Sequence, residues 1–147
     1  MDNSGTHVWL VLWKAYDALH SHAMSSIESL EMCITDFGIL ELLLHKGAAS
    51  INSLGERLSL SSGSATAAID RLELRKLVER VPSKTDRRIK MVELTREGKQ
   101  LIQKAFNKHS QHMEHAVGEL STNERTQLLI LLRKLGKSAQ QRLHNDA

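Results

Sequence analysis

The sequence predicts a mainly α-helical protein with a small β-wing: a winged helix-turn-helix with six helices and a two- to three-stranded antiparallel wing. Three observations indicate this fold class. Apolar residues recur at helical spacing over most of the 147 residues, and a single proline leaves long helices uninterrupted. Residues 51–58 and a helix beginning near Ser62 are joined by a tight, serine-rich turn. Residues 78–81 and 90–94 alternate as β-strands do, on either side of a charged turn.

The charge of the chain is unevenly distributed. The length fits one domain that can bury a core, and 41% of the residues are apolar. Residues 1–50 contain two basic and six acidic side chains, residues 51–104 contain twelve and seven, and residues 105–147 contain six and four. The formal net charge is only +3, but the positive charge collects in the helix-turn-helix segment. This distribution is typical of a protein that binds nucleic acid through one face.

Cysteine usage and hydropathy predict a soluble, cytoplasmic protein. The only cysteine, Cys33, excludes an intramolecular disulfide and suggests a reducing compartment. The apolar stretch near the start carries Lys14 and Asp17 and has no basic leader, so no signal peptide is expected. No apolar run approaches the roughly 20 residues that span a bilayer, so no membrane partner is expected.

The first half of the chain predicts three helices. Apolar positions predict a long helix from about residue 6 to residue 30. Thr35 is a good N-cap for a second helix through His45, and Gly47 is placed to end it. Because this second helix is apolar almost all round, we expect it in the middle of the core. Ser50 can cap the third helix, residues 51–58.

The second half predicts the wing and three more helices. The fourth helix begins near Ser62, and its core-facing positions are Ala65, Ile69, Leu72 and Leu77. The turn of the wing contains residues 82–85, with Pro82 among them. Thr95 caps a fifth helix that runs to about Val117. Ser121 and Glu124 form a capping box that opens the sixth.

The two end helices contain more apolar residues than a small winged domain can cover, which suggests self-association. We therefore expect residues 1–34 and 118–147 to be dimerisation helices, residues 35–98 the winged helix-turn-helix, and residues 95–117 a linking helix. The alternative is that both ends fold back on the same subunit.

Several ordered motifs resemble the MarR family of winged helix-turn-helix transcriptional regulators. They are residues 51–58, the run SSGSATAAIDRLE at 61–73, Asp86-Arg87-Arg88, and VELTREG at 92–98. The resemblance covers nearly the whole chain and implies a homodimer on a pseudopalindromic double-stranded DNA operator, usually a repressor that a small ligand or oxidant releases. Lys76 departs from the family, which usually has a helix-ending glycine there. Features around residues 35–47 and 61–64 look like the quinone- and catechol-responsive branch.

The start of the fourth helix predicts DNA contacts. Ser61, Ser62, Gly63 and Ser64 are small enough for the helix N-terminus to approach a phosphate. Thr66 and Ala67 suit base edges and thymine methyl groups, and Arg71 suits a phosphate or a guanine. The alternative reading is a simple N-cap run without DNA contact.

The resemblance also assigns roles in the wing. It implies that Arg88 enters the minor groove, whose negative potential attracts arginine, and that Asp86 holds the guanidinium of Arg88. Arg87 and Lys84 are better suited to backbone phosphates. The alternative is an ordinary solvated hairpin.

A small-molecule effector is the other expected partner. The resemblance places Cys33 near a ligand cleft, where its thiol would react with quinones or peroxides; a buried, inert cysteine is the alternative. An aromatic cleft could be lined by a set of ring-bearing side chains, which in the alternative reading are plain core: Trp9, Trp13, Tyr16, His20, Phe37, His45 and Phe106.

Other function classes have weaker support. His109, His112 and His115 could offer imidazoles to zinc, but they drift around their helix, so a metal-responsive regulator is an alternative and no metal or cofactor is expected. No phosphate-binding glycine loop or nucleophile elbow indicates an enzyme. A winged-helix module that binds proteins instead of specific DNA is the remaining alternative.

Overall fold

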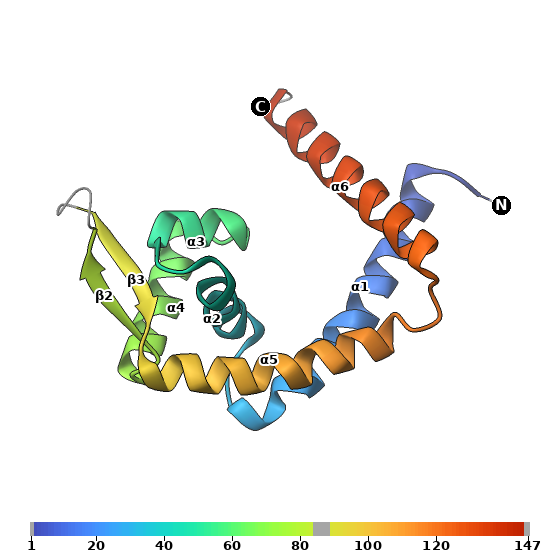
Figure 1. Ribbon diagram of the computed structural model, residues 1–147. Coiled ribbons are helices and arrows are strands. Elements are labelled where there is room, and N and C mark those ends of the chain that lie inside the picture. The colour runs from blue at the N-terminus through green and yellow to red at the C-terminus, as the bar shows by residue number, and fades with distance from the viewer. Residues whose placement is uncertain (1, 84–88, 146–147) are drawn as a thin grey trace. The chain divides into compact units, whose positions relative to one another are not determined.

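The computed structural model describes residues 2–83 and 89–145, apart from the side chain of His144. In this part of the chain it confirms the predicted fold class, with six α-helices and a three-stranded antiparallel sheet. Figure 1 labels the α-helices and the two longer strands, β2 and β3. The elements are α1 (Gly5–Ile27), η1 (Glu28–Leu30), α2 (Ile34–Lys46), β1 (Ala49–Ser50), α3 (Ile51–Arg57), α4 (Ser62–Leu74), β2 (Val78–Pro82), β3 (Lys90–Leu94), α5 (Arg96–Ala116) and α6 (Thr122–Asn145). Two compact units divide the chain, Met1–Met113 and Glu114–Ala147.

Helix α2 lies at the centre of the first unit, as its nearly continuous apolar sequence predicts. Phe37, Ile39 and Leu40 are at most 1% exposed. They join one core cluster with residues of α4, the sheet and α5, among them Ile69 and Ile102. Each such side chain contributes about 1.5–3 kcal/mol when it is fully buried. This core holds the helix-turn-helix against the wing.

The sheet has the order β1-β3-β2, and both pairings are antiparallel. The sequence predicted β2 and β3 but did not locate β1, whose two residues pair with Met91 and Val92. Pro82 belongs to β2 and not to the turn, since it pairs with Lys90 at the end of the ladder. A proline is tolerated there because β2 is an edge strand.

Most predicted helix ends are confirmed, but one cap is wrong. Ser50 accepts a hydrogen bond from the Ser53 backbone N–H (3.2 Å). Gly47 ends α2 with φ of 77°. Thr35, by contrast, is not the N-cap of α2: the helix begins at Ile34, and Cys33 occupies the cap without a side-chain hydrogen bond. Starting at Ile34 gives Phe37 a hydrogen bond from its N–H to the Cys33 carbonyl (3.1 Å).

Lys76 adopts the left-handed conformation that glycine usually supplies, with φ of 58°. Its N–H donates to the Glu73 carbonyl (2.9 Å), and the Leu77 N–H donates to the Leu72 carbonyl (3.0 Å). These two bonds form a Schellman motif, so α4 ends in the usual way despite the lysine. Leu77 is therefore buried just after the helix and not within it.

Thr95 and Gly98 join the end of α4 to the start of α5. Thr95 Oγ1 accepts from the Gly98 N–H (3.0 Å) and donates to the Lys76 carbonyl (2.7 Å). A Cβ built on Gly98 would lie 1.9 Å from the Leu77 carbonyl oxygen. This close approach of two backbones requires glycine.

In the second unit, the predicted capping box opens α6. Glu124 Oε2 accepts from the Ser121 N–H (2.8 Å), and Ser121 Oγ accepts from the Glu124 N–H (3.4 Å). Arg125 pairs with Glu114 (2.6 Å). The apolar residues of α6 are exposed, namely Leu128, Leu129, Ile130, Leu131, Leu132, Leu135 and Leu143. None of the helices in residues 2–83 and 89–145 has the length and apolar character needed to cross a membrane.

Candidate nucleic-acid interface

The N-terminal half of α4 presents a face of small, exposed side chains. Ser61 caps the helix: its Oγ accepts from the Ser64 N–H (3.1 Å) and donates to Ser64 Oγ (2.8 Å). Ala65, Ala68 and Ile69 turn inward and are completely buried. The predicted contact residues Ser61, Ser62, Gly63, Ser64, Thr66 and Ala67 are all exposed. This half of α4 therefore offers backbone N–H groups and small side chains to a ligand that approaches closely.

In the C-terminal half of α4, the first arginine pairs with a carboxylate of the same chain. Arg71 Nη2 and Nε donate to the two carboxylate oxygens of Asp36, at 2.6 and 3.1 Å. The Asp36 side chain is only 6% exposed, and its hydrogen bond is the main cause that raises the pKa of Arg71. Arg71 was predicted to contact phosphate or guanine. In the protein alone, its guanidinium instead ties α4 to the first turn of α2.

Arg75 makes a second connection to the same segment. Its Nη2 donates to the Leu30 carbonyl (3.0 Å) and its Nη1 to the Glu31 carbonyl (3.3 Å). Glu31 has a φ of 49°, which marks the sharp change of direction between η1 and α2. The two arginines together hold α4 to the junction that follows α1.

Arg80 connects the wing to α4. Its Nη2 donates to Asp70 Oδ1 (2.6 Å), and its Nη1 pairs with Glu73 Oε2. The hydrogen bond to Asp70 is the main cause that raises the pKa of Arg80. The sequence reasoning missed this arginine, because the alternation of β2 marks Arg80 only as a strand residue and does not identify its partners.

The four predicted wing residues, Lys84, Asp86, Arg87 and Arg88, lie outside the described residues. The base of their hairpin is described: the Ser83 N–H donates to the Ile89 carbonyl (2.9 Å), which closes the β2–β3 ladder. Strand β3 spans the predicted residues 90–94, while β2 extends one residue beyond the predicted 78–81.

Cys33 is exposed, so the buried alternative is wrong for this thiol. Its Sγ lies 3.9 Å from Arg71 Nη2. The thiol therefore stands beside the arginine that anchors α4.

Phe37 is core, 1% exposed, and its ring packs on the ring of His109 with a centroid distance of 4.8 Å. His109 Nδ1 is 2.8 Å from Ser26 Oγ. Because Ser26 Oγ already donates to the Ala23 carbonyl, the His109 ring is the donor. Burial lowers the pKa of His109.

The other predicted aromatic residues lie at separate places. Trp13 packs against Trp9 (5.9 Å between centroids) and Tyr16 against His20 (5.5 Å), on α1. Phe106 contacts His45 (4.6 Å between centroids), and these two predicted residues line one pocket that contains none of the other predicted effector residues.

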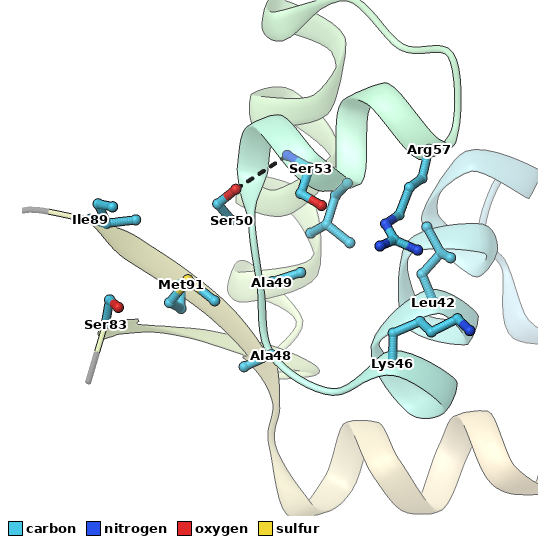
Figure 2. Close-up of a pocket in the computed structure, with 11 residues that line it drawn as sticks. Leu42, Lys46, Ala48, Ala49, Ser50, Ser53, Arg57, Ser83, Ile89 and Met91 are labelled. Atoms are coloured by element: carbon cyan, nitrogen blue, oxygen red, sulfur yellow. Dashed lines mark hydrogen bonds between the residues drawn. The ribbon is translucent and has the colours of Figure 1, made fainter. Parts of the chain in front are cut away.

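A pocket of about 410 Å³ lies between the end of α2, α3 and the base of the wing (Figure 2). Leu42, Leu54 and Met91 supply apolar lining, while Lys46 and Arg57 supply two cations. The sequence did not indicate it, because its lining comes from segments far apart in the chain. It contains none of the predicted effector residues.

The three histidines of α5 do not assemble a metal site. In the described part of the chain, no three histidine, cysteine, aspartate or glutamate side chains are placed to hold a metal ion together. His109 is instead engaged by Ser26 and Phe37.

Comparison with known proteins identifies the family. The family model described as "MarR family" matches residues 33–90. The transcriptional regulator MhqR of Bacillus subtilis is 32% identical over 145 residues, covering 99% of both chains. The regulator YkoM of the same organism is 30% identical and covers 91% of this chain and 87% of its own. Among solved structures, BpsR of Bordetella bronchiseptica aligns with a TM-score of 0.78 and 25% identity, covering 91% of this chain and 94% of that one.

These matches agree with the winged fold and with the family resemblance of the sequence. The relatives are transcriptional regulators and not enzymes. The chain therefore belongs to the MarR family of DNA-binding transcriptional regulators.

Proposed function

We propose that the protein is a homodimeric repressor that binds a pseudopalindromic operator and is released by a small aromatic or electrophilic effector. The observation that carries the proposal is the exposed, small-residue face of α4 from Ser61 to Ala67. This helix is followed by a β-hairpin whose turn sequence is basic. As a DNA-binding regulator, the protein would work in the cytoplasm, together with its chromosomal target.

In the proposed complex, the N-terminal half of α4 enters the major groove. Ser61, Ser62, Gly63 and Ser64 approach a phosphate, while Thr66 and Ala67 meet base edges. Lys84 and Arg87 contact the backbone, and Arg88, positioned by Asp86, enters the minor groove. Arg71, whose side chain is 51% exposed, contacts a phosphate or a guanine while its Nε and Nη2 remain bound to Asp36.

Self-association is supported by the apolar faces of the end helices. Trp9 and Trp13 of α1 are 59% and 57% exposed, and Leu131 of α6 is 61% exposed. A second copy of the chain would bury such surfaces and place two recognition helices about 34–36 Å apart, one turn of the duplex.

Effector release is supported by the relatives and by Cys33. The DNA binding of BpsR is regulated by 6-hydroxynicotinic acid, an aromatic acid. In this chain an electrophile that alkylates Cys33 would add bulk 3.9 Å from the Arg71 guanidinium and so disturb α4. Release follows if the modified or ligand-bound protein favours a different separation of the two recognition helices.

Fluorescence anisotropy with DNA from upstream of the protein's own gene tests specific binding. We expect tighter binding to this duplex than to a random duplex of the same length, and affinity that falls steeply as salt rises. Equal affinity for both duplexes at physiological salt contradicts the repressor proposal and favours a protein-binding module.

Two substitutions test the assigned residues. Arg88→Ala should lose much more operator affinity than the exposed control Arg142→Ala, because only Arg88 belongs to the wing; comparable losses argue against the wing assignment. Cys33→Ser should bind DNA normally but resist release by a quinone. Unchanged quinone release from Cys33→Ser rules out the thiol as sensor.

A further inference from the structure

We propose that Arg80 is a positioning residue for DNA binding: its contacts with Asp70 and Glu73 set the wing against the recognition helix α4. The inference rests on the proposed operator binding and adds a residue that contacts no DNA in the scheme above. A substitution of Arg80 therefore leaves all the proposed DNA-contacting side chains of α4 and of the wing in the sequence.

The register of the sheet directs Arg80 toward α4. Side chains two residues apart share one face of a strand, so Arg80 shares a face with Val78. Val78 is 1% exposed and belongs to the core cluster that includes Ile69 and Leu72 of α4. Arg80 therefore extends from the helix-facing side of β2, in the middle of the strand, opposite Val92.

The partners of Arg80 lie on successive turns of α4. Asp70 and Glu73 are three residues apart, so they are neighbours on one side of the helix. One planar guanidinium donates to both, with Nη2 on Asp70 at 2.6 Å and Nη1 on Glu73. A fork held at two points restricts rotation and sliding of the strand along the helix, which a single contact does not.

The exposed fractions of the three side chains indicate that their ion pairs add little to folding stability. The side chains of Asp70 and Glu73 are 60% and 40% exposed, while that of Arg80 is 23% exposed. Ion pairs with such exposed carboxylates contribute little to folding stability. The role of the fork must then be sought in the geometry of the wing and α4, because binding one half-site requires both elements in register with adjacent grooves.

The test compares Arg80→Gln and Arg80→Lys with the exposed control Arg142→Gln. Affinities for the upstream duplex and for a random duplex are measured by anisotropy over a range of salt concentrations. For Arg80→Gln we expect about a tenfold loss on the upstream duplex, a much smaller loss on the random duplex, and an unchanged salt slope. Arg80→Lys, which keeps one charged contact, should lose less.

Two other roles for Arg80 give different results. A direct phosphate contact would weaken both duplexes equally and reduce the salt slope by about one. Simple masking of acidic charge would be reversed by adding Asp70→Asn and Glu73→Gln to Arg80→Gln. Either result overturns the positioning role.

Amide hydrogen exchange provides a readout that does not depend on DNA. In Arg80→Gln the β2–β3 amides should exchange faster than in the wild type, while the α2 amides keep their protection. Unchanged exchange in the hairpin overturns the inference even if the wild type shows no operator preference. If the wild type prefers its upstream DNA and Arg80→Gln behaves like Arg142→Gln, only this inference fails.

Discussion

The core around α2 and the two end helices, α1 and α6, differ in the burial of their apolar side chains. In the core, Phe37, Ile39 and Leu40 are completely or almost completely buried. In the end helices, side chains of similar size, such as Trp13 and Leu131, are more than half exposed. The core therefore satisfies its apolar residues within one chain, whereas the faces of α1 and α6 leave them available to a partner surface.

Helix α1 contains both behaviours. Its first half exposes Trp9 and Trp13, while Ala23, Ser26 and Ile27 near its end are buried. This difference predicts which property, unfolding or self-association, each kind of variant should change. A change in the core should alter unfolding at every protein concentration, and a change on the exposed faces should alter association and so depend on concentration.

The largest expected effect is in the core, at Gly98→Ala. The new Cβ would meet the Leu77 carbonyl oxygen at 1.9 Å, so β2 or α5 must move. We expect a loss of more than about 3 kcal/mol in the free energy of unfolding, as for other severe core disruptions. Urea denaturation at two protein concentrations measures it. Gly63→Ala, whose Cβ meets nothing within 4 Å, is the control and should not destabilise; similar values for both variants refute the close-approach argument.

The next effect is at the ion pair that anchors α4. Arg71→Met leaves the Asp36 carboxylate buried without its partner, which should cost about 2 kcal/mol of unfolding free energy. Adding Asp36→Leu removes the stranded charge and should restore most of this loss. A double-mutant cycle from urea denaturation measures the coupling. Additive losses would mean that the two residues do not depend on each other.

These two predictions concern features that sequence reasoning could not locate. Caps such as Ser50, Ser61 and Ser121 were predictable, because each contacts a group three residues away in the chain. The pairing of Asp36 with Arg71 joins positions 35 residues apart, and nothing local distinguishes it from a solvated aspartate.

The errors have the same physical origin. Thr35 has the right chemistry for a cap, yet α2 begins before it, and Asp36 and Phe37 are both buried in its first turn. The two residues of β1 have no strand pattern of their own and form a strand only through Met91 and Val92 of β3. For the candidate site, the α4 face was readable from helical periodicity, whereas the partners of Arg71, Arg75 and Arg80 required tertiary structure.

A smaller effect is expected on the exposed face of α6. Leu131→Lys should weaken self-association about tenfold, because the charge must be desolvated at a dimer contact. Gln140→Lys, nine residues later, lies on the opposite side of the helix and is the matched control. Sedimentation velocity over a concentration series measures both. Equal dimer affinity for Leu131→Lys, Gln140→Lys and the wild type would remove Leu131 from the interface.

Lys76→Gly should stabilise the core slightly. The φ of 58° at Lys76 is strained for a residue with a Cβ, and glycine relieves this strain while loosening the unfolded chain. The net gain should be about 0.5–1 kcal/mol in unfolding free energy. Lys99→Gly, within α5, is the control and should lower the unfolding free energy, because glycine is unfavourable inside a helix. A destabilised Lys76→Gly would mean that the lysine side chain makes up for the strain.

The smallest effect is a pH dependence at the buried end of α1. Burial lowers the pKa of His109, with Glu41 raising it and His112 lowering it further, so the folded protein holds the imidazole neutral below the usual pKa of 6.5. The unfolded chain takes up the proton first as pH falls. The contribution of His109 is therefore present above about pH 6.5 and is lost as pH falls toward the lower pKa of the folded state. His109→Gln should flatten the fall in unfolding free energy between about pH 7.5 and 5.5, and a pH series of urea denaturations measures it. The slope should be the same at every protein concentration, because His109 contacts Ser26 and Phe37 inside the core; a concentration-dependent slope would place this histidine in the association surface instead.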